Sequence, residues 1–433
     1  YMENPTRSLE EAPLIIVGQE NYGKLEPIVR DNYFTFEYMR LWWPNQDYFN
    51  LNWERIKNAL SSPDKRQALF NIWFNRDYSL YAQITNNSHL TLADWLPSDK
   101  MRFYIRKDIA AKIWEYGSAA SLHNLLEENP YESKIDPLMP TRVISGGGKA
   151  PGQLNEPRGI ALAPDGSIYV ADSKNNRIQH FSNSGELLNM WGSFANIANG
   201  DAPGGTFYEP WDIAISPDGY IYVTDTWNHR IQKFSSDGKF IKMWGYFAQG
   251  ISPEGFWGPR GIAINKDGQI FVTDTGNKRI VVFDGEGNYV TQFGTGGLEL
   301  GQFDEPVGLA FDQNDNLYVA DTWNRRVQLL HPDPGKTTYS AIASWDIDGW
   351  YGQSLNNKPF ITVGPTGNIF ISDPESSCIL EFSSSGKFLH GWEISSLSED
   401  IISQPVDLAF DSQGNLWVSD ASSNMIMVFN LPQ

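Results

Sequence analysis

The chain has 433 residues, of which 41% are hydrophobic and 20% charged, and its formal net charge is −19. This length suits more than one domain, and the composition is that of a globular protein, not a disordered one. The negative charge argues against nucleic-acid binding, which requires clustered Lys and Arg side chains. Cys378 is the only cysteine, so no internal disulfide can form.

The first 127 residues are predicted to form a small α/β domain with the element order β-α-β-α-α-β-α. Apolar or alternating stretches at 14–17, 34–38 and 101–106 predict strands. Helices are predicted over 52–60, 63–75 and 108–124, the second with Ser62 as its N-cap. A linker that contains three prolines, residues 128–140, leads to the second domain.

From Thr141 onward the chain repeats one pattern six times. Each copy begins with a proline followed by small and apolar residues, and an aspartate closes its second strand. Successive aspartates are 53, 49, 47, 52 and 47 residues apart; they are Asp172, Asp225, Asp274, Asp321, Asp373 and Asp420. Repeats of this length indicate stacked four-stranded sheets, none of which buries its faces alone.

The two ends of the repeat region complement each other. The last copy stops after three strands, at Phe429, whereas an additional strand over 142–145 precedes the first copy. We expect this early strand to complete the sixth sheet and so to remove the exposed edges of both ends. The predicted fold is therefore mainly β: a six-bladed β-propeller over 141–433, closed by its N-terminal strand and preceded by the small α/β domain.

The turns that follow the second strands carry a recognisable signature. They read Asp-Thr-Trp-Asn-His-Arg-Ile at 225–231, Asp-Thr-Gly-Asn-Lys-Arg-Ile at 274–280 and Asp-Thr-Trp-Asn-Arg-Arg-Val at 321–327. This pattern resembles the NHL repeat family, and the resemblance implies the six-bladed fold. The fifth and sixth copies lack the arginine. Function does not follow from the fold, because propellers host lyases, lactonases, sensors and scaffolds.

The repeated aspartates are interpreted as structural. A carboxylate at the end of a strand can accept hydrogen bonds from turn N–H groups and can pair with the arginine of the repeat. These arginines are Arg177, Arg230, Arg279 and Arg326.

Two stretches of the N-terminal domain carry a second resemblance. Residues 41–49 (Leu-Trp-Trp-Pro-Asn-Gln-Asp-Tyr-Phe) and 102–108 (Arg-Phe-Tyr-Ile-Arg-Lys-Asp) resemble the soluble tail of some prokaryotic membrane glycosyltransferases, of the mannosyltransferase and oligosaccharyltransferase type. The resemblance implies an extracytoplasmic or cell-surface accessory part, anchored by a membrane region before Tyr1, and not the catalyst itself.

One face of the propeller is expected to carry the loops that follow the second and fourth strands. Aromatic rings beside carboxylates and arginines suit a sugar ring or a protein partner. The candidate binding residues are Arg158, Trp211, Asp212, Trp227, Arg260, Trp323, Trp350 and Asp407. The competing interpretation is that these tryptophans pack between neighbouring blades.

Three functions remain open. The leading hypothesis is a non-catalytic module that binds glycan or protein and needs no cofactor. The second is a metal-assisted hydrolase or lyase with Ca²⁺ or Zn²⁺ in the central channel, where Asp212 and Asp407 are the only inner-strand carboxylates. The third is a structural protein that assembles with copies of itself.

Overall fold

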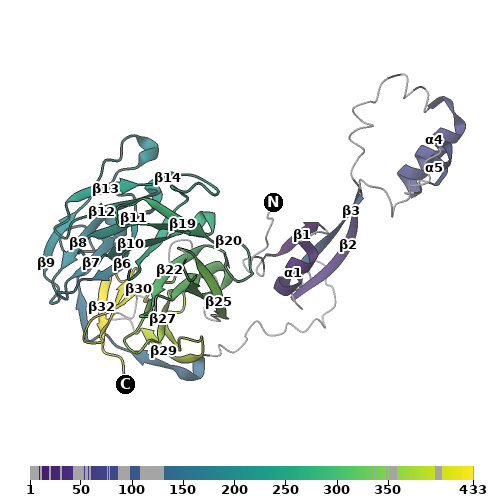
Figure 1. Ribbon diagram of the computed structural model, residues 1–433. Coiled ribbons are helices and arrows are strands. Elements are labelled where there is room, and N and C mark those ends of the chain that lie inside the picture. Colours follow the sequence, from purple (N-terminus) through teal and green to yellow (C-terminus); the bar gives the residue numbers. More distant parts are fainter. Residues whose placement is uncertain are drawn as a thin grey trace. The chain divides into compact units, whose positions relative to one another are not determined.

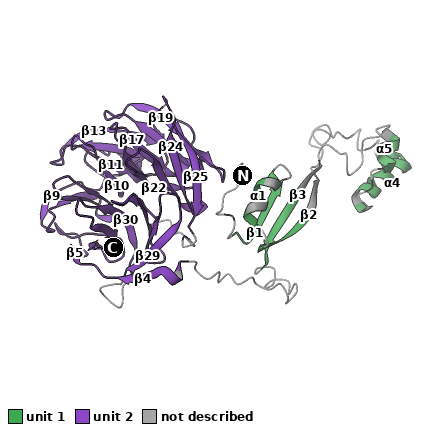
Figure 2. Cartoon of the chain, turned by 60° about the horizontal axis from the view of Figure 1, so that its bottom comes forward, with its two compact units in different colours: residues 1–125 green, residues 126–433 purple. Residues whose placement is uncertain are grey.

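The chain divides into two compact units, Tyr1–Leu125 and Leu126–Gln433 (Figure 2). The computed structural model describes residues 9, 12–18, 21–29, 32–41, 53, 57, 60–75, 77, 79–85, 98–107, 131–335, 337–347, 350, 358–394 and 402–432. Within these ranges, no helix is long and apolar enough to cross a membrane.

The first unit contains a three-stranded antiparallel sheet in the order β1 (Leu14–Gly18), β3 (Ser98–Arg106), β2 (Tyr33–Leu41). All three strands match predicted ones, with longer bounds. Helix α1 (Tyr22–Val29) connects β1 to β2, as the predicted element order requires.

The helices of this unit agree with the sequence only in part. Helix α4 (Pro63–Phe70) begins where predicted, and the Ser62 hydroxyl accepts a hydrogen bond from the Lys65 N–H at 3.4 Å. It continues as a π-helical turn, η4 (Asn71–Asn75), and is followed by the unpredicted helix α5 (Ser79–Thr85). The predicted helices over 52–60 and 108–124 lie outside the described residues, apart from isolated positions.

The second unit is mainly β, and Figure 1 shows its sheets arranged around a common centre. Four of its larger sheets consist of four consecutive strands each. Their strands are β6 (Pro157–Leu162), β7 (Ile168–Asp172), β8 (Arg177–Phe181) and β9 (Leu187–Trp191); β10 (Pro210–Ile215), β11 (Ile221–Asp225), β12 (Arg230–Phe234) and β13 (Phe240–Trp244); β16 (Pro259–Ile264), β17 (Ile270–Asp274), β18 (Arg279–Phe283) and β19 (Tyr289–Phe293); and β22 (Pro306–Phe311), β23 (Leu317–Asp321), β24 (Arg326–Pro332) and β25 (Tyr339–Asp346).

Two further sheets recruit strands from the start of the unit. The fifth contains β26 (Ile361–Val363), β27 (Ile369–Asp373), β28 (Cys378–Phe382), β29 (Phe388–Ile394) and β4 (Ile135–Leu138). The sixth contains β30 (Pro405–Phe410), β31 (Leu416–Asp420), β32 (Met425–Phe429) and β5 (Arg142–Ile144). The sequence predicted a linker over 128–140; instead η5 (Glu132–Lys134) and β4 form there, and β4 pairs parallel with β29.

The core lies between neighbouring sheets. The second strand of every sheet is buried along its whole length, because sheets cover both of its faces. Each large hydrophobic cluster spans two consecutive sheets, and one joins Trp417 and Ile426 of the last sheet to Ile160 and Val170 of the first. The first strands also contact one another in turn, and β30 contacts β6.

Tryptophans of the fourth strands pack against the next sheet. The Trp191 indole packs on Gly238 and the Trp244 indole on Gly287, each a turn glycine of the next sheet. Both glycines have positive φ, and a Cβ at either would stand 2.6 Å from an indole carbon. These tryptophans therefore fill the space between neighbouring sheets.

The repeated aspartate is the centre of a polar network, clearest at Asp225. Its carboxylate accepts hydrogen bonds from the Tyr208 N–H at 2.7 Å, from the Asn228 amide and from Arg230 Nε at 2.7 Å. The rest of the Arg230 guanidinium donates to carbonyls of the preceding connection, including that of Thr206 at 2.8 Å. One buried carboxylate thus holds both a turn and the loop that precedes the sheet.

The same ion pair occurs in the first four sheets, with Nε to Oδ2 distances of 2.6 to 2.8 Å between Asp172 and Arg177, Asp225 and Arg230, Asp274 and Arg279, and Asp321 and Arg326. The last two sheets have Cys378 and Met425 in place of the arginine. Burial raises the pKa of Asp373 to about 7, whereas Asp420 accepts hydrogen bonds from Ser403, Gln404 and Ser423.

Replacing Arg279 by methionine, the residue of the sixth sheet at this position, should lower the free energy of unfolding by about 3–5 kcal/mol, because the buried Asp274 carboxylate loses its cationic partner. Urea denaturation at neutral pH measures this change. Lys239→Met, which removes an exposed ion pair with Asp237, is the control and should leave the unfolding curve unchanged. Equal effects of the two substitutions would contradict a stabilising role for the buried pair.

Candidate functional site

The residues that follow the repeat prolines converge where the six first strands meet. In β10, two residues, Trp211 and Asp212, oppose a single residue of β11, which is a β-bulge. Trp211 is only 1% exposed and forms one buried cluster with residues of the other sheets, namely Val307, Phe360, Val406 and Ala421. We call this set the central cluster.

Two arginines enclose the tryptophan of the central cluster. The guanidinium carbons of Arg158 and Arg260 lie 4.2 and 4.4 Å from the Trp211 ring centroid. Both arginines are buried, and burial lowers the pKa of Arg158 to about 10. Stacking on an aromatic ring partly replaces the hydration that these cations lose.

A third buried cation lies beside them. The Lys358 ammonium lies 4.7 Å from the Trp323 ring centroid and 3.1 Å from a carboxylate oxygen of Glu305, which also pairs with Arg260 at 3.5 Å. Burial lowers the pKa of Lys358 to about 8, although the Glu305 charge opposes this shift. The centre of this face is therefore a dense network of cations and carboxylates.

The carboxylates of this network come from residues that the sequence analysis missed. Glu156, Glu209 and Glu305 immediately precede repeat prolines and have φ values of 45°, 52° and 48°. A non-glycine residue in this left-handed region costs roughly 1–2 kcal/mol. Lys174 lies 2.9 Å from Glu209 and 4.0 Å from Glu156, so one lysine bridges two of them. The recurring Glu-Pro pair was the available signal.

Asp212 and Asp407 hold neighbouring sheets together. Asp212 accepts hydrogen bonds from the Ile213 and Ile262 N–H groups, and Asp407 from those of Leu408 and Ile160, all at 2.7 or 2.8 Å. Burial raises the pKa of Asp407 to about 7. Burial also raises the pKa of Asp212 well above its usual range, and the Asp407 charge raises it further.

Hydroxyl groups next to the repeated aspartates make similar connections and were also missed. Thr224 accepts a hydrogen bond from the Asp212 N–H at 2.8 Å and donates one to the Arg260 carbonyl at 2.8 Å. The equivalent side chains Thr273, Ser372 and Ser419 likewise donate to a carbonyl of the following sheet. A hydroxyl fits here because it both donates and accepts.

The predicted binding tryptophans do not form one exposed set. Trp211 is enclosed, and Trp350 is buried with its Nε1 donating to the Ser372 carbonyl at 3.2 Å. Trp323 is half-buried beside Lys358, whereas Trp227 is 36% exposed and donates to Glu209. Exposure of Trp211 and Trp350 was therefore wrongly expected: the sheets meet closely enough to cover both rings. Arg158, Arg260, Asp212 and Asp407 are buried with them.

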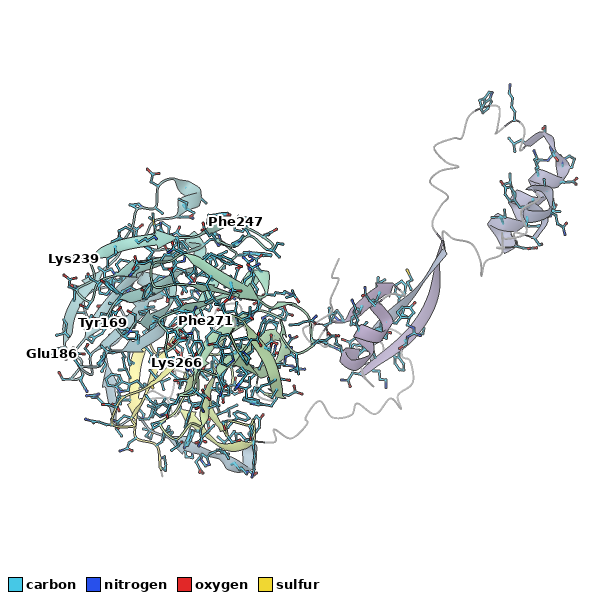
Figure 3. The ribbon with its side chains drawn as sticks, in the orientation of Figure 1. Tyr169, Glu186, Lys239, Phe247, Lys266 and Phe271 are labelled. Atoms are coloured by element: carbon cyan, nitrogen blue, oxygen red, sulfur yellow. The ribbon has the colours of Figure 1, made fainter. Side chains whose placement is uncertain are left out.

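Trp227 belongs to a group of apolar side chains that are exposed on this face. They belong to the connections 193–209 and 245–258 and to the turn η8 (Thr226–Asn228). We call them the aromatic rim: Phe194, Ile197, Trp227, Tyr246, Phe247, Ile251 and Trp257. Figure 3 labels Phe247, which belongs to the short strand β14 (Tyr246–Phe247).

A metal centre finds little support among the described residues, where no group of three or more His, Cys, Asp and Glu side chains is placed to hold an ion. Asp212 and Asp407 each already accept two backbone hydrogen bonds. Burial raises the pKa of both carboxyls and so disfavours the charged form that would bind a cation.

Four segments of the chain match the NHL repeat: residues 154–181, 207–234, 256–283 and 303–328. The first three run from the end of a connection through the first three strands of a sheet, and the fourth ends within β24. The second unit is thus a β-propeller whose first four sheets carry NHL repeats, the repeat that the sequence signature resembles.

Curated relatives match only part of the chain. Peptidyl-glycine alpha-amidating monooxygenase of Mus musculus is 32% identical over 103 residues, which is 23% of this chain and 10% of that protein. Protein SUPPRESSOR OF QUENCHING 1, chloroplastic, of Arabidopsis thaliana is 26% identical over 143 residues, 30% of this chain and 13% of that protein. The match therefore spans about a tenth of these relatives' length.

Among solved structures, a streptogramin B lyase is 17% identical with a TM-score of 0.46, covering 67% of this chain and 98% of that one. A gluconolactonase from Xanthomonas campestris is 14% identical with a TM-score of 0.48, covering 69% and 100%. None of these four proteins supports the glycosyltransferase resemblance, which stays a prediction.

The Asp407→Asn substitution should flatten the pH dependence of stability. Because burial raises the pKa of Asp407 to about 7, folding takes up a proton there, and the stabilisation present at acidic pH is lost as pH rises toward 7. Asparagine does not titrate, so the slope of unfolding free energy against pH between about 4 and 7 should change by up to about 1.4 kcal/mol per pH unit. Urea titrations at several pH values measure it, and an unchanged slope would contradict a titrating buried carboxyl.

Proposed function

We propose that the second unit is a six-bladed propeller, closed between its last and first sheets, that acts as a non-catalytic binding module. Pairing of β5 with β32 and contact between β30 and β6 support closure. The binding surface is the face that carries the aromatic rim. Its partner is a protein or a glycan.

The enclosure of Trp211 is the observation that carries this proposal. An enzyme with its site in a propeller channel must admit substrate to the inner strands. Here Arg158, Trp211 and Arg260 stack together at the start of those strands and are almost fully buried. Contact with a partner therefore falls on the exposed rim around the central cluster, where contiguous apolar side chains are typical of interaction sites.

A metal-assisted hydrolase or lyase is the alternative. The match to an amidating monooxygenase over 103 residues favours it, as does the charge coupling between Asp212 and Asp407. This alternative requires a bound metal ion, which elemental analysis of the purified protein would detect. It also requires both buried carboxyls to ionise, although burial raises the pKa of each.

The binding face can be tested by paired substitutions. The double variant Trp227→Ala, Trp257→Ala should lose binding to any hit from a glycan array or a peptide array, because both indoles are exposed on the proposed face. Tyr220→Ala, Tyr289→Ala is the matched control, since these similarly exposed rings follow the turns at the opposite ends of the strands. Binding lost only in the tyrosine variant would contradict the proposed face.

A further inference from the structure

Ring contacts and a hydrogen bond link the parts of the aromatic rim that lie in the two connections. The Phe194 and Tyr208 ring centroids are 5.3 Å apart, and the Tyr208 carbonyl accepts a hydrogen bond from the Trp227 N–H at 3.2 Å. On the other side, the Phe247 ring lies 4.8 Å from that of His229, two residues after Trp227. Contacts through Tyr208 and His229 therefore link the rim residues of one connection to those of the next.

Asparagine side chains hold both connections in place. Asn228 donates to the Ala195 carbonyl and accepts from the Ile197 N–H, both at 2.9 Å. Asn277 does the same for the second connection, donating to the Ala248 carbonyl at 2.9 Å and accepting from the Gly250 N–H at 2.8 Å. A surface ordered before binding loses less conformational entropy when a partner docks.

The two connections are apolar and acidic. Residues 193–209 and 245–258 contain no Lys or Arg but include Asp201, Glu209 and Glu254. Glu209 pairs with Lys174, whereas Asp201 and Glu254 are exposed. The next connection, 294–305, continues the pattern with Leu300 and Glu299 exposed and again without Lys or Arg.

The cations nearest the rim are already engaged. Lys174 lies 2.9 Å from Glu209, Lys278 lies 2.6 Å from Asp304, and Arg230 is buried against Asp225. Burial lowers the pKa of His229, so this imidazole adds no positive charge at neutral pH. Asp201 and Glu254 consequently leave negative charge beside exposed aromatic rings.

We infer that the aromatic rim binds a segment of a partner protein in which Lys or Arg side chains alternate with apolar ones. The apolar side chains would cover the rim, while the cations would meet Asp201 and Glu254 and the exposed ring faces. This inference rests on the proposed binding function and specifies which of its two partner classes is bound, namely a protein.

Other occupants fit less well. Ile197 and Ile251 lack the flat faces on which sugar rings stack, yet Ile251 is 82% exposed. A second copy of the chain would bring another 19 formal negative charges to an acidic surface. A nucleic acid would be repelled for the same reason.

Short synthetic peptides test the inference on the full chain. One peptide alternates Leu or Phe with Arg, a second replaces Arg by Glu, and a third replaces the apolar residues by Ser. Fluorescence anisotropy should show saturable binding of the first peptide, at least about tenfold weaker binding of the serine peptide, and no binding of the glutamate peptide.

Matched variants locate the site. The triple variant Phe194→Ser, Phe247→Ser, Ile251→Ser should weaken binding of the first peptide by at least about tenfold. The control Leu188→Ser, Ile342→Ser removes similarly exposed apolar side chains from β9 and β25 and should bind normally. Asp201→Asn, Glu254→Gln should slow association and reduce the salt dependence of binding.

The inference would be overturned by no binding of the first peptide, by equal binding of the parent and the rim variant, or by self-association that the rim variant abolishes. Glycan-array binding that the Trp227→Ala, Trp257→Ala variant loses, with no peptide binding, would also overturn it but would leave the proposed function standing. If every ligand bound only to the opposite face, which carries Tyr220 and Tyr289, both the inference and the proposed function would be contradicted.

Discussion

Hydrogen bonds to the buried carboxylate at the end of each second strand are the interactions on which the face with the connections depends. A single side chain such as Asp225 accepts hydrogen bonds from the turn behind it, from the preceding connection and from an arginine that itself binds the connection's carbonyls. Side-chain amides such as that of Asn228 hold the same connections through further hydrogen bonds. These hydrogen bonds fix the backbone of the connections, while the side chains of the aromatic rim stay exposed.

The centre of the same face uses charge in another way. Arg158 and Arg260 are buried against the Trp211 ring, and Lys358 is buried beside Trp323. Three glutamates adopt a left-handed backbone just before a proline, and two of them supply carboxylates to these cations. Ring stacking and ion pairing offset the cost of burying the cations and of the strained backbone, and they fill the centre of this face.

Much of the fold could be predicted because each repeat contains residues that mark where its strands end. The closing aspartates, the Asp-Gly turns and the early strand at Arg142 mark strand ends that depend on local backbone chemistry. Strand β4 could not be predicted, since its proline-containing sequence reads as a linker until it meets the edge of β29.

The candidate site was harder to predict for a physical reason. Trp211 and Trp227 both lie within the repeated pattern, the first directly after a repeat proline and the second in the turn after a second strand. Their burial differs because Trp211 begins a first strand, where all sheets meet, whereas Trp227 lies in an outward turn. That distinction depends on distances between sheets, which no single repeat encodes. Apart from Trp227, the residues of the aromatic rim were overlooked because they lie in the connections, which vary between copies.

Amide hydrogen exchange measures most directly whether buried carboxylates hold this face. The N–H groups of Asn155, Tyr208, Trp257 and Asp304 belong to connections, yet each donates to a repeated aspartate at 2.6 or 2.7 Å. If these anchors order the connections, the four amides should exchange as slowly as those within β11 and β17, through global unfolding. Exchange at the rate of exposed loop amides would contradict a rigid platform and, with it, the binding surface built on it.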